Sequence, residues 1–258
     1  MERKDFIKQS VLSGLSLTVL GKAVIDPVSC SETPDETEGP FPTHMPGKFI
    51  TPNIRADRMG TPLLITIAVN NINAKCGGLK GAIVDIWHCD SKGEYSEYGG
   101  IDEHGPGRMS MPPPGPHPPH NDSAMKNGPM PPAPMAGGSM QAADHKKEHF
   151  LRGRQISDSS GLVSFHSIYP GWYPRRAPHI HVHIYGPGGK SLLVTQIAFP
   201  EEISKAVYQQ GIYAPHGLPD TSNMTDNVFN DSIANELATL SGSISEGFLL
   251  RHSIYVKA

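Results

Sequence analysis

Three histidines at alternate positions offer the clearest chemistry in the sequence. His179, His181 and His183 lie in the segment HIHVHIY, where isoleucine and valine fill the positions between them. Alternate side chains of a β-strand share a face, so the segment predicts imidazoles on one face and aliphatic side chains on the other. Histidines two positions apart have β-carbons about 6.6 Å apart and can bind one ion, whereas the outer two are about 13 Å apart. The spacing alone favours a solvated polar strand face and allows a metal site that uses one adjacent pair, so the surrounding residues must decide between the two.

Tyrosines near these histidines indicate which metal such a site would suit. Tyr173 lies in the turn PGWYPRR just before the histidines, and Tyr95 and Tyr98 follow a strand and turn in WHCDSKGE. A phenol titrates near pH 10, so only a strongly Lewis-acidic ion holds it as phenolate at neutral pH. Two phenolates and two imidazoles suit hard, trivalent iron. Tyrosines that do not meet the histidines would be core or rim residues.

The elements that must position these side chains are mostly strands. β-Branched and aromatic runs recur about every ten residues between glycine, proline, serine and aspartate, which is typical of a β-sandwich or barrel. One helix is expected over residues 200–210, where Pro200 and two early glutamates favour a start. The predicted fold class is all-β, a β-sandwich with long irregular loops and little helix. The expected strands are residues 62–71, 81–90, 149–157, 161–169, 179–185, 191–199 and 246–258.

The first thirty residues have the organisation of an export signal. Arg3, Lys4 and Lys8 precede an apolar stretch over 11–20, which is too short to span a bilayer but suits a signal-peptide core. The motif RKDFIK approximates a twin-arginine signal, with Lys4 in place of the second arginine. The ending PVSC loosely resembles a lipoprotein cleavage site, which leaves a lipid anchor at Cys30 open. We expect an exported, periplasmic or cell-envelope protein; an N-terminal core helix is the alternative.

The rest of the chain, residues 31–258, is predicted to form a single domain. Its 99–146 segment is dense in proline, glycine, methionine and histidine, and predicts a long mobile loop, with a Cu(I) site as the alternative. Twenty-two basic against 25 acidic residues give a net charge of −3, which favours a small ligand and excludes a basic surface for nucleic acid. In an oxidising compartment Cys76 and Cys89 could pair, although the expected strand before Cys89 makes their separation barely bridgeable.

Several ordered motifs together resemble the intradiol ring-cleavage dioxygenases, the catechol and protocatechuate family that uses non-haem Fe(III). The similarity runs from about Thr33 to the C-terminus. TPDETEGPFP is similar to a segment near the family's N-terminus, and LKGAIVDIWHCDSKGEYSEY to the strand that leads to its first tyrosine ligand. FLRGRQISDSSGLVSFHSIYPGWYPRRAPHIHVHIY resembles its metal-binding core, and LLVTQIAFPEE the strand and turn that follow. Only five residues separate Tyr173 from His179, as in a shorter, exported branch, which leaves the substrate's ring substituents open.

The resemblance implies a ligand set, an activity and roles for individual residues. The implied Fe(III) ligands are Tyr95, Tyr173, His179 and His181, with Tyr98 as the alternative to Tyr95 and no role assigned to His183. Arg176 and Gln196 are implied to lie beside the substrate and O2, with Tyr173 as a base and Arg176 as an electrostatic stabiliser. The implied reaction cleaves a catechol-type ring between its hydroxyls with O2 and gives a muconate-type diacid.

Two other functions are consistent with parts of the sequence. A periplasmic copper-binding protein would use the 99–146 segment, and a ligand-binding β-sandwich would need no metal. The pattern HKKEH, residues 145–149, matches a zinc-protease motif but lies between a loop and a strand, so we attribute it to chance. Whether the chain forms a homo-oligomer stays open.

Overall fold

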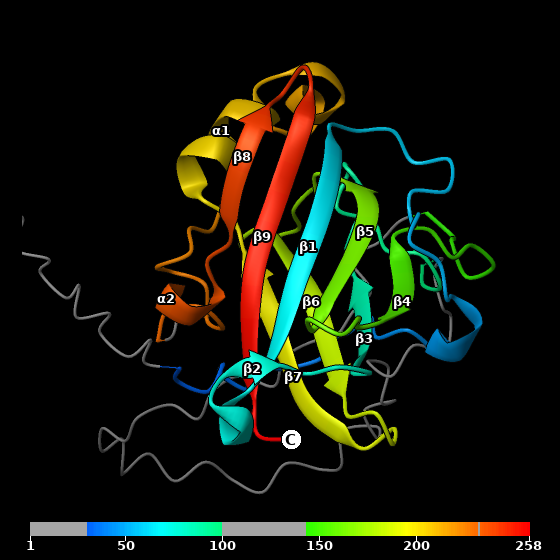
Figure 1. Cartoon of the computed structure of the whole chain (residues 1–258). Helices are drawn as coiled ribbons and strands as arrows, with labels where there is room; N and C mark the ends of the chain where they lie inside the picture. Colours follow the sequence, from blue (N-terminus) through cyan, green and yellow to red (C-terminus); the bar gives the residue numbers. More distant parts are fainter. Residues whose placement is uncertain (1–29, 100–142, 232) are drawn as a thin grey trace, which may run out of the picture.

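The structure is a computed structural model that describes residues 30–99, 143–231 and 233–258. Most of its regular structure is strand, arranged in two sheets, which confirms the predicted all-β sandwich (Figure 1). Within the described ranges no helix has the length and apolar character needed to cross a membrane. The expected export signal up to residue 29, and residues 100–142 of the proline- and methionine-rich segment, lie outside the described residues.

Nine strands, two α-helices and three 3-10 helices make up the described secondary structure. The strands are β1 Pro62–Asn71, β2 Gly77–Gly78, β3 Ile83–Trp87, β4 Arg152–Ile156, β5 Leu162–Ile168, β6 His179–Tyr185, β7 Ser191–Ala198, β8 Thr239–Ser243 and β9 Gly247–Val256. The α-helices are α1 Glu201–Tyr208 and α2 Ile233–Glu236. The 3-10 helices are η1 Pro46–Lys48, η2 Ile72–Ala74 and η3 Gly211–His216. All seven expected strands and the expected helix are present. The sequence analysis missed β2, β8 and α2, which are short.

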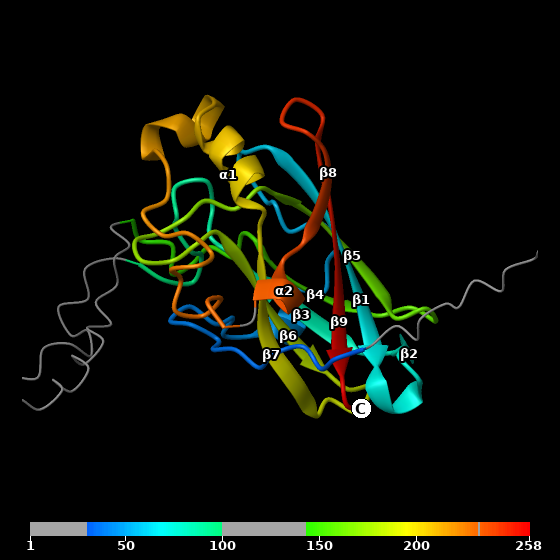
Figure 2. The same ribbon diagram turned by 90° about the vertical axis from the view of Figure 1, so that its left-hand side faces the viewer.

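The two sheets differ in their strand directions. In the first sheet β1 pairs antiparallel with β2 and β5 and parallel with β9, whose other neighbour is β8. The second sheet has the order β4-β3-β6-β7 and is antiparallel throughout. Figure 1 looks onto the first sheet with β6 and β7 behind it, and Figure 2 shows the two layers from the side.

The core between the sheets confirms which face of β6 is apolar. Ile180, Val182 and Ile184 are fully buried in the same cluster as Ile65 and Ile67 of β1. Because side chains alternate along a strand, the histidines of β6 must lie on the outer face of the second sheet. His179 and His181 are nevertheless 2% and 0% exposed, so loops and the N-terminal arm cover that face.

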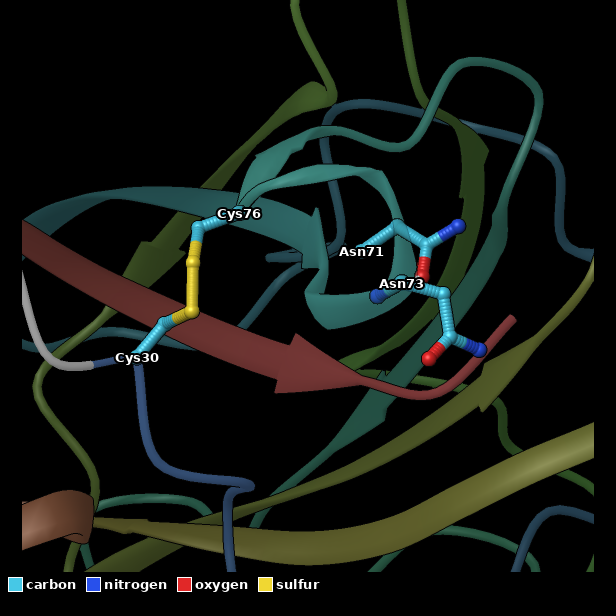
Figure 3. Close-up of a disulfide and its surroundings, with 4 residues drawn as sticks. All are labelled: Cys30, Asn71, Asn73 and Cys76. Carbon is cyan, nitrogen blue, oxygen red and sulfur yellow. Dashed lines mark hydrogen bonds between the residues drawn. A yellow bond between two sulfur atoms is a disulfide. The ribbon is translucent and has the colours of Figure 1, made fainter.

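The N-terminal arm, residues 30–45, is joined to the first sheet by a disulfide between Cys30 and Cys76 (Figure 3). Cys89 is a buried free thiol, so pairing of Cys76 with Cys89 does not occur in this structure. The physical reason is that residues 77–78 pair with the end of β1 in one sheet, whereas Cys89 follows β3 in the other. The disulfide also occupies the sulfur to which a lipid anchor would be attached, so the two modifications of Cys30 exclude each other.

Candidate metal centre

Strand β6 brings two of its three histidines together on the outer face of the second sheet. Nε2 of His179 lies 3.1 Å from Nε2 of His181, with the two rings nearly perpendicular. His183 is separate from this pair, because its Nε2 contacts the Ser191 hydroxyl at 2.8 Å and its Nδ1 lies 3.2 Å from a Glu38 carboxylate oxygen. The adjacent pair and the separate third histidine agree with the metal site that the spacing allows.

The sheet register places a row of side chains around His181. Trp87 of β3 and Gln196 of β7 are its direct cross-strand neighbours. The indole of Trp87 stacks on the imidazole of His181 with ring centroids 5.0 Å apart and an interplanar angle of 3°. This stacking fixes the ring plane of His181, because both groups are buried.

Two tyrosine hydroxyls meet the histidine pair. The Tyr173 hydroxyl lies 3.2 Å from Nε2 of His179, and the Tyr95 hydroxyl lies 3.5 Å from the same nitrogen. Tyr98 points elsewhere, since its hydroxyl donates to the Pro42 carbonyl at 2.6 Å. Of the two tyrosines that the sequence left open in the 95–98 segment, the structure places Tyr95 in the cluster.

Two turns pack tightly to bring these tyrosines together. Asp90 accepts from the backbone N–H groups of Lys92 and Glu94, which shapes the turn before Tyr95. Gly93 has φ +85°, and a Cβ there would lie 2.2 Å from the Trp172 carbonyl oxygen. Only glycine permits this approach of the first turn to the segment that carries Tyr173.

The protonation states of the cluster follow from burial and from one backbone contact. Nδ1 of His179 lies 2.6 Å from the Ala177 carbonyl oxygen, which can only accept, so Nδ1 carries the proton and Nε2 presents a lone pair. Burial, with Arg176 second, holds the pKa of His179 and of His181 well below the usual range. Burial also raises the pKa of Tyr95, and that of Tyr173 to about 12. Without a cation all four groups are therefore neutral at pH 7.

The donor set fits a trivalent iron ion. The other three donor atoms lie 3.1 to 3.5 Å from Nε2 of His179, a spacing compatible with donors that share one ion with bonds of about 2 Å. Nε2 of His179 presents its lone pair toward Nε2 of His181 at 3.1 Å, so either a proton on that nitrogen of His181 or a shared cation satisfies it. No group of three or more His, Cys, Asp or Glu side chains in the described ranges could hold a metal, so this candidate depends on its tyrosines.

A charged group, Arg176, lies beside the cluster, where the family resemblance implies it. Nη1 of Arg176 is 3.4 Å from the Tyr173 hydroxyl, and Nη2 donates to Oε1 of Gln196 at 2.5 Å. Gln196 in turn donates to the Thr37 carbonyl at 2.9 Å and so ties the site to the N-terminal arm. The structure therefore brings both predicted pocket residues next to the four candidate ligands.

Two features of the site were missed by the sequence analysis. Asp226 pairs with Arg176 across 50 residues, and no motif or periodicity marks it. The N-terminal arm covers the cluster: Phe41 stacks on Tyr95 with centroids 4.6 Å apart, and Gly39 lies against the ring of His181. The motif GPFP was part of the family resemblance, but nothing in its pattern indicated that it covers the histidines.

The zinc-protease pattern does not form the helix that its chemistry needs. Residues 145–149 form a turn, where His145 contacts Glu94 and Glu148, and His149 contacts Glu97. The attribution to chance agrees with this geometry. The suggested copper-binding segment lies largely outside the described residues.

No protein-family model matches the chain. Solved structures do match it over most of its length. An intradiol ring-cleavage dioxygenase from Tetranychus urticae has a TM-score of 0.65 and 26% sequence identity, covering 88% of this chain and 95% of that one. The dioxygenase domain of a carbohydrate-binding fusion protein from a Streptomyces species has a TM-score of 0.53 and 20% identity, covering 88% and 99% of the two chains.

A third structure, hydroxyquinol 1,2-dioxygenase from Pseudomonas putida, has a TM-score of 0.53 and 16% identity, covering 89% of this chain and 68% of that one. At these identities the second and third matches show a common fold. The first match adds sequence similarity along nearly the whole of a shorter dioxygenase. The resemblance that the sequence motifs indicate is thereby confirmed: this chain has the fold of the intradiol ring-cleavage dioxygenases.

Proposed function

We propose that the protein is an intradiol dioxygenase that binds Fe(III) through Tyr95, Tyr173, His179 and His181. Its substrate would be a catechol-type ring, cleaved between the two hydroxyl-bearing carbons. Both atoms of O2 enter the product, a muconate-type diacid. The observation that carries the proposal is that the two phenol oxygens and Nε2 of His181 all lie 3.1 to 3.5 Å from Nε2 of His179. The shared fold supports the same reaction class.

Fe(III), when bound, supplies the Lewis acidity that keeps phenol oxygens deprotonated near neutral pH and activates the catechol ring toward O2. The residues of the chain supply binding, proton transfer and charge stabilisation. Tyr173 is only partly buried, whereas Tyr95 is fully buried. Tyr173 is therefore the more exposed of the two tyrosines, and it is the one that we propose to accept a substrate proton.

Arg176 is placed to stabilise negative charge next to that oxygen. Its Nη1 lies 3.4 Å from the Tyr173 hydroxyl, while its other contacts hold the guanidinium in place. A preorganised donor in a buried site stabilises developing charge more than it would in water. Phe41 stacks on Tyr95 and Trp87 stacks on His181, and these two rings limit the access of water to the proposed ligands.

Iron loading with matched tyrosine variants tests the proposal. The iron-loaded protein should convert catechol and O2 to a muconate-type diacid, followed by liquid chromatography and oxygen uptake. Tyr173→Phe should lose turnover, because it removes the oxygen that takes the proton. Tyr98→Phe is the control, since Tyr98 lies outside the cluster. Turnover that survives Tyr173→Phe unchanged would contradict the proposal.

A deletion separates this proposal from copper binding by the 99–146 segment. Gly99 and Asp144 are bridged to each other, so a short glycine linker can replace residues 100–142 without moving the ends. The deleted protein should still bind iron through the four-residue cluster. Loss of all metal binding on deletion would favour the copper alternative.

We further propose that the protein is exported. The Cys30–Cys76 disulfide supports an oxidising compartment, because such bonds persist mainly outside the cytoplasm. Cell fractionation with mass spectrometry of the intact protein tests this. A periplasmic chain that has lost its first residues and has one disulfide is expected, and full-length reduced protein in the cytoplasm would contradict it.

A further inference from the structure

Asp226 is a fully buried carboxylate next to the candidate metal centre, and it has no role in the reaction proposed above. Both of its oxygens contact Nε of Arg176, at 2.9 and 3.2 Å. Its remaining contacts are backbone N–H groups, from Ala177 at 2.6 Å and from Val228 at 2.8 Å. A buried carboxylate is tolerated only when it is paired and hydrogen-bonded, and here it is both.

These contacts leave the guanidinium of Arg176 with one orientation. Asp226 engages Nε on one edge, and Oε1 of Gln196 engages Nη2. Nη1 is the nitrogen that remains, and it faces the Tyr173 hydroxyl. A free arginine side chain carries about 2 kcal/mol of rotamer entropy, so a guanidinium held at two edges is preorganised.

The Asp226 carboxylate is also linked to the candidate metal ligand His179, through the backbone of Ala177. Asp226 accepts from the N–H of Ala177, and the carbonyl of Ala177 accepts from Nδ1 of His179. Ala177, which directly follows Arg176, is therefore fixed at both its backbone N–H and its carbonyl group. Displacement of Asp226 would shift the charge-stabilising group and the histidine anchor together.

We propose that Asp226 is a positioning residue that orients Arg176 toward the Tyr173 oxygen and fixes the Ala177 backbone that holds His179. This inference rests on the proposed function, because it assigns Asp226 to the same reaction. Asp226 does not touch the reacting atoms: it acts on kcat through Arg176 and on the position of His179 through the Ala177 backbone. Its contribution to catalysis is therefore the fall in kcat per bound iron when Asp226 is substituted and Arg176 is kept.

Asp226→Asn is the primary variant. It keeps the size of the side chain but puts an NH2 group where one oxygen accepts from Arg176 and Ala177. We expect kcat per bound iron to fall about 10- to 100-fold, the loss typical of a misplaced catalytic group. Asp220→Asn is the matched control: Asp220 is an exposed carboxylate of the same region that contacts the backbone of Arg175 and should leave kcat unchanged.

A double-variant cycle separates positioning from a merely structural role. Arg176→Gln removes the group through which Asp226 acts on kcat per bound iron, so adding Asp226→Asn should then change this kcat by less than twofold, while its effect on iron affinity through Ala177 and His179 should persist. A full additional 10-fold loss in the Arg176→Gln background would overturn the proposal. An unchanged kcat per iron in Asp226→Asn, with only lower stability, would overturn it as well.

A second readout needs no iron. In the iron-free protein the Arg176 Nε–H should give a solvent-protected 15N–1H signal, which Asp226→Asn should lose and Asp220→Asn should keep. If Asp226→Asn is insoluble, Asp226→Glu replaces it: the charge is kept but displaced by one methylene, and we expect a smaller loss of kcat. Wild-type kcat in Asp226→Glu would then count against positioning.

The outcomes also separate this inference from the proposed function. Iron-loaded wild-type protein that neither binds nor cleaves catechol would refute the function itself. Active wild-type protein whose Asp226 variants match it would refute only the role of Asp226.

Discussion

The contact between the N-terminal arm and His181 predicts the effect of a single methyl group at Gly39. Gly39 has φ +68°, and a Cβ placed there would lie 2.8 Å from Cε1 of His181. Neither the His181 ring nor the N-terminal arm can easily move to make room for this methyl group. The His181 ring is stacked on Trp87, and the arm is held on both sides of Gly39 by Gln196 at the Thr37 carbonyl and by Arg152 at the Phe41 carbonyl.

The magnitude follows from two separate costs. A left-handed backbone conformation costs a non-glycine residue about 1–2 kcal/mol, and overpacking a buried site costs about 1–3 kcal/mol. Gly39→Ala should therefore lower the free energy of unfolding by about 2–5 kcal/mol. Gly189→Ala is the matched control. Gly189 has φ +81° with nothing within 4 Å of its Cβ position, so this substitution has the backbone cost without the overpacking.

Urea unfolding of both iron-free variants measures the difference, which we expect to be about 1–3 kcal/mol. Titration with Fe(III) should show that Gly39→Ala loses at least about tenfold in iron affinity while Gly189→Ala does not. Equal effects of the two substitutions on unfolding and on iron affinity would refute the packing of the arm against the metal centre.

Two further predictions concern stability. Cys76→Ser should lower the free energy of unfolding under oxidising conditions by up to about 4 kcal/mol, because the disulfide closes a loop over 46 residues, and dithiothreitol should have the same effect on the wild type but none on the variant. Burial lowers the pKa of His252 from 6.5 to about 4, so its neutral form stabilises the fold fully above pH 6.5 and progressively less as the pH falls toward 4. Urea unfolding should show a contribution of about 2 kcal/mol lost between pH 7.5 and pH 5, absent in His252→Gln; a pH dependence that His252→Gln leaves unchanged would contradict this.

The sequence predicted local features of the fold and site well. The bounds of β6 agree with the expected strand, because the alternation of histidine with isoleucine and valine is a strong period-two signal. β1 also agrees with its β-branched run from Pro62 to Asn71. By contrast β2 has two residues, both glycine, and β8 has one aliphatic residue in five, so neither has a pattern to detect.

Long-range pairings were not predictable from pattern alone. The partner of Cys76 is Cys30 in the arm, and the expected strand before Cys89 gave no information about that arm. Asp226 meets Arg176 only because residues 222–231 fold back over β6 and β7, and the few apolar residues of that segment, Met224, Val228 and Phe229, have no regular period. The family resemblance located Arg176 and Gln196, whereas their partner Asp226 and the packing of Gly39 required the three-dimensional arrangement.

The most direct test of the central claim is the visible absorption spectrum of iron-loaded protein before and after anaerobic addition of catechol. Phenolate bound to Fe(III) absorbs by charge transfer, so the protein should be coloured, its absorption should shift to longer wavelength with catechol, and the colour should be lost in the Tyr95→Phe, Tyr173→Phe double variant. The Tyr98→Phe control should keep the wild-type spectrum. A colourless protein that takes up no iron, or a colour that the double variant retains, would contradict the assignment of this cluster as a ferric site.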